Sequence, residues 1–118
     1  MNQLIRKTEK KKIIENPRGG EGTIELYEIF GSDETLGNVS LFAKVVLKPQ
    51  TIIGFHEHHG EAEVYYVTKG KGFFIRNNQE RIAVKAGDAC MMEVGHGHGM
   101  ENPNDEEMEI IAVVYPER

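Results

Sequence analysis

The chain has 118 residues, of which 39% are hydrophobic and 28% charged, and its formal net charge is −5 at pH 7. This length suits one domain with a modest core. The acidic balance gives no reason to expect a nucleic-acid partner, and no run approaches the ~20 apolar residues of a membrane-spanning helix. The single cysteine excludes an internal disulfide framework. No apolar secretory segment follows the basic N-terminus, so we expect a cytoplasmic protein with no membrane partner.

The first 22 residues are polar and charged, with Lys7, Lys10, Lys11 and Lys12 close together. We expect a solvated arm or a first edge strand here, ahead of a main domain over residues 23–118. A run of proline, arginine and two glycines at residues 17–20 predicts a turn.

Short strand-like runs follow at regular spacing, separated by turn residues and rich in β-branched and aromatic side chains. The expected strands are Thr23–Phe30, Ser40–Leu47, Glu63–Val67, Phe73–Arg76, Arg81–Val84, Ala89–Val94 and Met108–Tyr115, and Thr51–Ile53 leads into a histidine-rich segment. No run shows a convincing 3.6-residue period. The pattern therefore predicts an all-β fold, an antiparallel sandwich or barrel.

The histidine-rich segment places three histidines and three glutamates within residues 56–63. On a strand, His56 and His58 point to the same side because side chains alternate between faces. Gly60 predicts a tight turn, which we expect to fold the strand of Glu63 back beside the strand of His56. Two imidazoles and one carboxylate form a suitable set of ligands for a divalent transition metal.

The remaining two histidines, His96 and His98, lie in a second cluster between Gly95 and Gly99. All five histidines of the chain are thus confined to two short, glycine-containing segments. This concentration favours a common site over two solvated polar loops.

Both segments resemble the two sequence motifs of the cupin superfamily. In the first, four residues separate His58 from Glu63, and six separate Glu63 from Gly70. In the second, Gly87, Gly95, His98 and Asn102 fall at the motif's spacings. The chain departs from the family at Gln50, where the first motif opens with glycine, and at Glu93, where the second has proline.

The resemblance implies a single small jelly-roll β-barrel (a double-stranded β-helix) that forms a homodimer. It also implies that His56, His58, Glu63 and His98 are the ligands of one divalent metal ion per chain, which could be Mn, Fe, Ni or Zn. Such a shell leaves one or two coordination positions open for water, substrate or O₂.

Several residues near the motifs have alternative roles. Glu61 is a rival to Glu63 as the carboxylate ligand, and His59 should point away from the site. His96 is a candidate catalytic or substrate-contacting group, although an exposed loop position is equally consistent with its sequence. Cys90 is expected to be a buried small hydrophobic residue, with a ligand role as the alternative.

Five apolar residues are assigned to the core or the wall of a pocket: Tyr65, Phe73, Met91, Met92 and Met100. Asn102 is expected to shape the turn after His98. Gly70 and Gly87 are expected to serve as turn positions.

For function, the sequence favours a metalloenzyme acting on a small polar molecule, a sugar or an organic acid, as a dioxygenase, decarboxylase or isomerase. Decarboxylation of a small diacid calls for an interior cation, and Arg76 and Arg81 flank a surface turn, which disfavours it. The alternative is a non-catalytic module that binds or senses a small ligand. A third class, a structural relative without metal, would have lost ligands that this chain retains.

Overall fold

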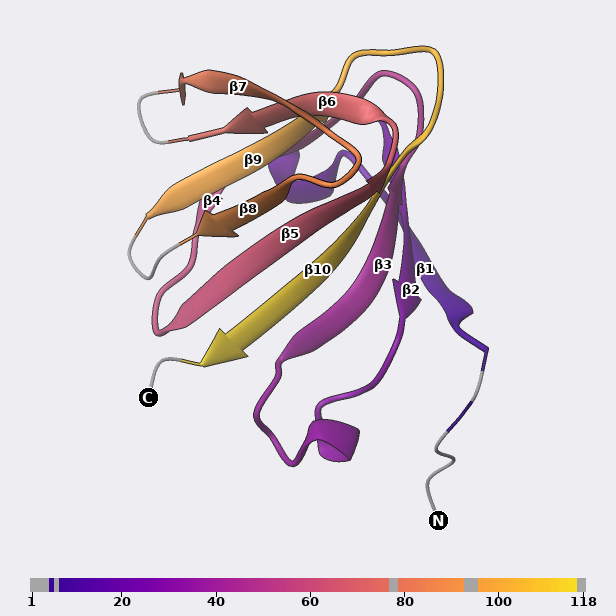
Figure 1. The fold of residues 1–118 in the computed structure, drawn as a ribbon, viewed down its shortest axis with the longest axis vertical. Coiled ribbons are helices and arrows are strands. Elements are labelled where there is room, and N and C mark those ends of the chain that lie inside the picture. Colours follow the sequence, from indigo (N-terminus) through magenta and orange to yellow (C-terminus); the bar gives the residue numbers. More distant parts are fainter. Residues whose placement is uncertain (1–4, 6, 77–78, 93–95, 117–118) are drawn as a thin grey trace.

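The computed structural model describes residue 5 and residues 7–76, 79–92 and 96–116. Within these residues the chain forms ten strands and two short 3₁₀ turns (Figure 1). The elements are β1 (Glu9–Glu15), η1 (Pro17–Gly19), β2 (Thr23–Glu28), η2 (Asp33–Thr35), β3 (Leu41–Leu47), β4 (Thr51–Glu57), β5 (Glu61–Lys69), β6 (Lys71–Ile75), β7 (Arg81–Lys85), β8 (Ala89–Met92), β9 (Gly97–Asn102) and β10 (Met108–Pro116). No helix among the described residues is long and apolar enough to cross a membrane.

The strands form two antiparallel sheets. The first has six strands in the order β1-β2-β3-β10-β5-β8, and the second has four in the order β4-β9-β6-β7. The sheets pack face to face as a jelly roll, which confirms the expected architecture, but no ladder among the described residues closes them into a continuous barrel.

The chain between β4 and β5 corrects one expectation. We expected the turn at Gly60 to place the two strands side by side, but β4 pairs with β9, while β5 pairs with β10 and β8. Gly60 does adopt a left-handed conformation, with φ of 75°. The turn carries the chain from one sheet to the other, so β4 and β5 belong to opposite walls of the molecule.

Two further strands, β9 and β1, were not clearly predicted from the sequence. The second histidine cluster runs directly into a strand, β9, which the glycines at 97 and 99 hid from a propensity-based reading. At the N-terminus, β1 pairs with β2 from Glu9 to Glu15, so the edge-strand alternative is the observed one.

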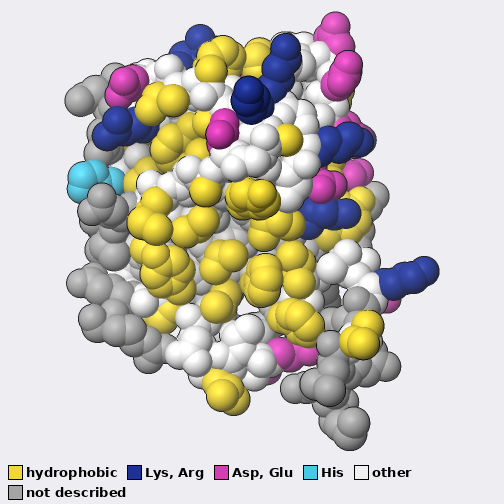
Figure 2. All heavy atoms as spheres, viewed as in Figure 1, with side chains coloured by type: hydrophobic (Ala, Val, Ile, Leu, Met, Phe, Trp, Pro, Cys, Tyr) yellow, Lys and Arg dark blue, Asp and Glu magenta, His cyan; other side chains and the backbone are white. Residues whose placement is uncertain are grey.

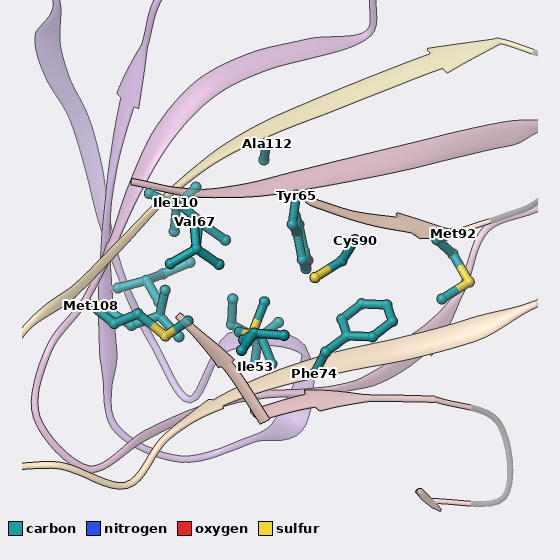
Figure 3. Close-up of a cluster of buried hydrophobic side chains, with 14 residues drawn as sticks. Ile53, Tyr65, Val67, Phe74, Cys90, Met92, Met108, Ile110 and Ala112 are labelled. Atoms are coloured by element: carbon teal, nitrogen blue, oxygen red, sulfur yellow. The ribbon is translucent and has the colours of Figure 1, made fainter. Parts of the chain in front are cut away.

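The core fills the space between the sheets, and its filling changes along the strands (Figure 3). On β10 the inward row runs from Met108, which is fully buried, through Ile110 to the smaller Ala112 and Val114. Large side chains therefore fill one end of the space, which we call the closed end. At the other end, the open end, smaller residues leave room.

The outer face of the six-stranded sheet also carries a row of apolar side chains. Strand register aligns Phe42, Val113, Val64 and Met91 in one row across β3, β10, β5 and β8. Figure 2 shows hydrophobic side chains gathered across the middle of the molecule, over these strands. Met91 is 63% exposed in this row, so its assignment to the core or pocket was wrong, whereas Met92 and Met100 are buried as expected.

Candidate metal centre

The four residues that the resemblance implied as metal ligands come together at the open end. One ligand atom from each of His56, His58, Glu63 and His98 lies within 4.8 Å of all the others. His56 on β4 is the register partner of His98 on β9, and His58 follows the end of β4. Glu63 reaches the three imidazoles from β5, across the space between the sheets.

The separations fit a bound cation. Glu63 Oε1 lies 2.8 Å from both His58 Nε2 and His98 Nε2, and 3.9 Å from His56 Nε2. His98 Nε2 is 2.9 Å from His56 Nε2. Ligand atoms about 2.1 Å from a transition metal ion and at right angles to one another would be ~3 Å apart. The four donors are therefore preorganised for an ion, with small adjustments.

Neighbouring groups fix the orientation of the imidazoles. His56 Nδ1 lies 2.7 Å from the carbonyl oxygen of Gly54, so its Nδ1–H donates to that carbonyl and Nε2 faces the cluster. A hydrogen bond of this kind selects the tautomer that can bind a metal. The ring of Tyr65 stacks on His98 at 4.9 Å between centroids and 15° between planes.

The protonation states also suit a metal site. Burial on its own would raise the pKa of Glu63, but its interactions with the neighbouring imidazoles of His56, His98 and His58 outweigh it and lower the pKa from 4.5 to about 2. Burial lowers the pKa of His98, and contact with Glu63 opposes this only in part. An ionised carboxylate and a neutral imidazole are the forms that coordinate metals.

The other polar candidates lie outside the cluster. The side chain of His59 is 79% exposed and lies 3.6 Å from Glu57, as expected for a residue on the opposite face. Glu61 accepts a hydrogen bond from the Ser40 hydroxyl instead of facing the imidazoles. His96 is exposed, and its proposed catalytic role stays a prediction.

The apolar candidates divide between core and surface. Cys90 packs in the core, as expected, and burial raises the pKa of its thiol to about 11. Tyr65 is buried and also lines the cavity described below. Phe73 was misassigned, because it lies on the outer side of β6 under the guanidinium of Arg81, and Phe74 takes the inward position. Arg76 and Arg81 pair with Glu80 and Glu101.

Asn102 does more than shape a turn. Its buried amide donates hydrogen bonds to the carbonyl oxygens of Leu47, Lys48 and Glu106 and accepts one from the backbone N–H of Asn104. It therefore ties the loop after β9 to the end of β3.

A cavity of about 230 Å³ adjoins the group of four side chains, His56, His58, Glu63 and His98, which we call the metal cluster. Its described lining consists of Ile14, Pro17, Arg18, Ile24, Leu26, Leu41, Val45, Ile53, His56, His58, Glu63, Tyr65, Ile110, Ala112 and Val114. Most of this wall is aliphatic and comes from the inner face of the six-stranded sheet. The cluster supplies the polar part, and Arg18 adds a charge.

Sequence reasoning missed Arg18, because residues 17–20 were interpreted only as a turn. The turn η1 packs on β4 through backbone contacts. Glu21 and Ile52 exchange N–H···O hydrogen bonds of 3.0 and 2.8 Å, and a Cβ atom at Gly20 or Gly54 would collide with the facing backbone. One signal in the sequence could have indicated this contact. Gly54 does not belong to the cupin motif spacing, and its lack of a side chain lets the backbone of the turn approach β4.

Comparison with known proteins supports the same architecture. Residues 43–114 match the family model of the cupin domain. An oxalate-binding protein of Thermotoga maritima is 36% identical over 101 residues, which are 86% of this chain and 83% of that protein. The crystal structure of a predicted oxalate decarboxylase from Thermotoga maritima matches with a TM-score of 0.86 at 34% identity, covering 90% of this chain and 91% of the other. A Photorhabdus luminescens protein shares the fold, with a TM-score of 0.76 at 20% identity over 99% of this chain and 90% of its own.

Proposed function

Since the chain belongs to the cupin superfamily, we propose that it binds one divalent transition metal ion through His56, His58, Glu63 and His98 and acts there on a small organic acid. The convergence of four donor atoms within 4.8 Å, three of them on buried residues, carries this proposal. Three imidazole nitrogens and a carboxylate oxygen suit Mn, Fe, Ni or Zn.

A metal bound by four protein atoms would supply a Lewis acid with positions for oxygen ligands. The residues of the chain provide the remaining functions. Glu63 stays ionised, and the carbonyl of Gly54 holds His56 in the required tautomer. Tyr65 covers one side of His98, and aliphatic side chains line most of the adjoining cavity. Oriented donor side chains beside a mostly aliphatic cavity thus support a metalloenzyme.

An organic acid is favoured over a sugar as the ligand. Sugar hydroxyls need hydrogen-bond partners, and an unpaired buried polar group costs roughly 1–3 kcal/mol. The cavity beside the cluster offers mainly aliphatic side chains. The names of the Thermotoga maritima proteins, which refer to oxalate, point to the same chemical class.

A second candidate function is ligand binding without turnover. The relative that is 36% identical is named as a binding protein, which favours this option. The two functions share the site and differ in whether a bound acid is converted. Turnover of candidate acids by the metal-loaded protein, followed by product analysis, separates them. The exposed His96 is the residue to substitute if turnover is found.

The metal site is tested by elemental analysis of protein purified without chelator or nickel resin. We expect about one equivalent of metal per chain in the wild type. His58→Ala should reduce metal content at least tenfold, because it removes one of four ligands. The matched control is His59→Ala, which should retain the metal. Full metal retention in the His58→Ala protein would contradict the proposed ligand set.

We also propose that the protein is a homodimer in which the outer face of the six-stranded sheet packs against the same face of a second chain. Exposed apolar patches often mark interfaces, and the uncharged row of Phe42, Val113, Val64 and Met91 suits an equally apolar partner. Light scattering should give a dimer mass, and Val113→Lys should give a monomer. Ile82→Lys, on β7 of the other sheet, should remain dimeric. A monomeric wild type would contradict this proposal.

A further inference from the structure

The composition of the cavity restricts the ligand more than the metal cluster does. Nine of its lining residues are aliphatic: Ile14, Ile24, Leu26, Leu41, Val45, Ile53, Ile110, Ala112 and Val114. Such a wall stabilises a hydrocarbon and offers nothing to extra oxygen atoms. A compact diacid such as oxalate would leave this wall without a contact.

The volume of the cavity sets the size of the hydrocarbon. Apolar cavities of about 150 Å³ bind benzene in other proteins. The cavity here measures about 230 Å³ and also borders the metal cluster. It therefore has room for an oxygen-bearing head group together with a short branched or cyclic hydrocarbon body.

Arg18 supplies a positive charge at the same cavity. It is solvent-exposed and lines the wall of the cavity together with the buried Tyr65, whose ring stacks on His98. The turn η1 that carries it is fixed on β4, the strand of His56, by the paired backbone of Glu21 and Ile52. Arg18 thus lies at the wall that also carries the metal ligands.

The backbone of Arg18 supports a specific role for this side chain. Its φ and ψ of 53° and 34° lie in the left-handed region, which is unfavourable for residues other than glycine. Such conformations concentrate at functional sites, where the surrounding structure maintains them. Glycine follows directly at position 19 but not at position 18, so the chain keeps a long cationic side chain where glycine would be easier.

We propose that the ligand is a carboxylic acid with an apolar body of roughly four to seven carbons, whose carboxylate Arg18 binds while the aliphatic wall contacts the body. This inference deepens the proposed function and rests on it. The guanidinium can donate two parallel hydrogen bonds to a carboxylate. Arg18 is thereby a specificity residue, separate from the four metal ligands.

Two 2-oxo acids with the same head group test the proposal: pyruvate, with a one-carbon body, and 4-methyl-2-oxopentanoate, with a four-carbon branched body. Calorimetric titration is carried out on protein loaded with one equivalent of Mn²⁺, with metal content measured on the same sample. We expect the larger acid to bind about tenfold more tightly, since each buried methylene contributes favourably. Its uncharged analogue, 4-methyl-2-pentanone, should bind at least tenfold more weakly than the acid.

Two variants separate the contributions of the charge and the wall. Arg18→Gln should weaken both acids at least tenfold while metal content stays unchanged, and the control Arg76→Gln, at an arginine paired with Glu80, should have no effect. Leu41→Asn, a nearly isosteric change in the wall, should remove the preference for the larger acid but not the binding of pyruvate. The half-buried position of Leu41 makes this substitution compatible with folding.

The outcomes are distinguishable. Equal affinity for the two acids, or failure of metal-loaded protein to bind either one, would overturn the inference and leave the proposed metal site intact. Unchanged affinity in the Arg18→Gln protein would overturn the role of Arg18. Protein that takes up no metal would overturn the proposed function, and the inference with it.

Discussion

The two ends of the space between the sheets are built from the same strands but are filled differently. At the closed end, Leu47, Val67 and Met108 are fully buried. At the open end, Ala112 and Val114 continue the same inward row of β10 with less volume, and a cavity lies beside them. One strand thus contributes to stability at its beginning and to ligand space at its end.

The comparison shows how a small domain can keep an open site without losing its fold. Close packing is confined to one end, where each buried side chain adds dispersion and burial energy. The other end contains groups that a ligand or a metal can contact. If this division holds, substitutions at the closed end should affect stability alone, and substitutions at the open end should affect the site.

The largest expected difference between the two ends is in the stability that is lost when a large side chain is removed. Met108→Ala should reduce the free energy of unfolding by about 2–5 kcal/mol, because it leaves a void in the packed core. Leu26→Ala, which enlarges an existing cavity, should cost about 1 kcal/mol. Urea unfolding of the two proteins measures both values.

Metal content is the control for this pair. Both variants should retain about one equivalent of metal, since neither residue supplies a metal ligand. Equal losses of stability in the two variants would contradict the distinction between the ends. Loss of metal in the Met108→Ala protein would show that the closed end holds the site in place.

A smaller effect on stability is expected from pH, because the titrating groups Glu63 and His98 lie at the open end. In metal-free protein, the pKa of Glu63 is about 2 when folded and 4.5 when unfolded, so its stabilising effect is complete above pH 4.5 and is lost as the pH falls towards 2. The loss should be on the order of 3 kcal/mol. The pKa of His98 is also lowered, so protonation of the unfolded state begins to reduce stability below pH 6.5.

Thermal unfolding of chelator-treated protein between pH 7 and pH 3 tests this dependence. Glu63→Gln should flatten the part of the curve below pH 4.5, whereas Glu61→Gln, whose carboxylate bonds to Ser40, should not. A curve for the Glu63→Gln protein that follows the wild type would place the titrating groups elsewhere. Added metal should raise stability most near neutral pH, where protons do not compete for the ligands.

Much of the site could be predicted from the sequence because the spacing of residues within short segments determines it. The alternation of a strand places His56 and His58 together, and the cupin spacing adds Glu63 and His98. The partner of each strand is not local information. Nothing in the turn at Gly60 indicates whether the chain stays in one sheet or crosses to the other, so the expectation that the two strands lie side by side was wrong.

The remaining errors have similar physical causes. Met91 and Met92 are equally apolar, and only the register of β8 against β5 shows which one faces outward. Phe73 and Phe74 pose the same problem on β6. Arg18 could not be connected with the site, because its position depends on a contact between backbones that are distant in sequence.

The attachment of η1 to β4 has a consequence for how such proteins can diversify. The contact uses the backbone of Glu21 and Ile52 and the absence of side chains at Gly20 and Gly54. The exposed side chain of Arg18 is therefore not needed to hold the turn in place, whereas Pro17 is buried. Position 18 could be exchanged over evolutionary time, or by an engineer, while the metal ligands stay the same, so that one metal centre could be adapted to a series of different acids.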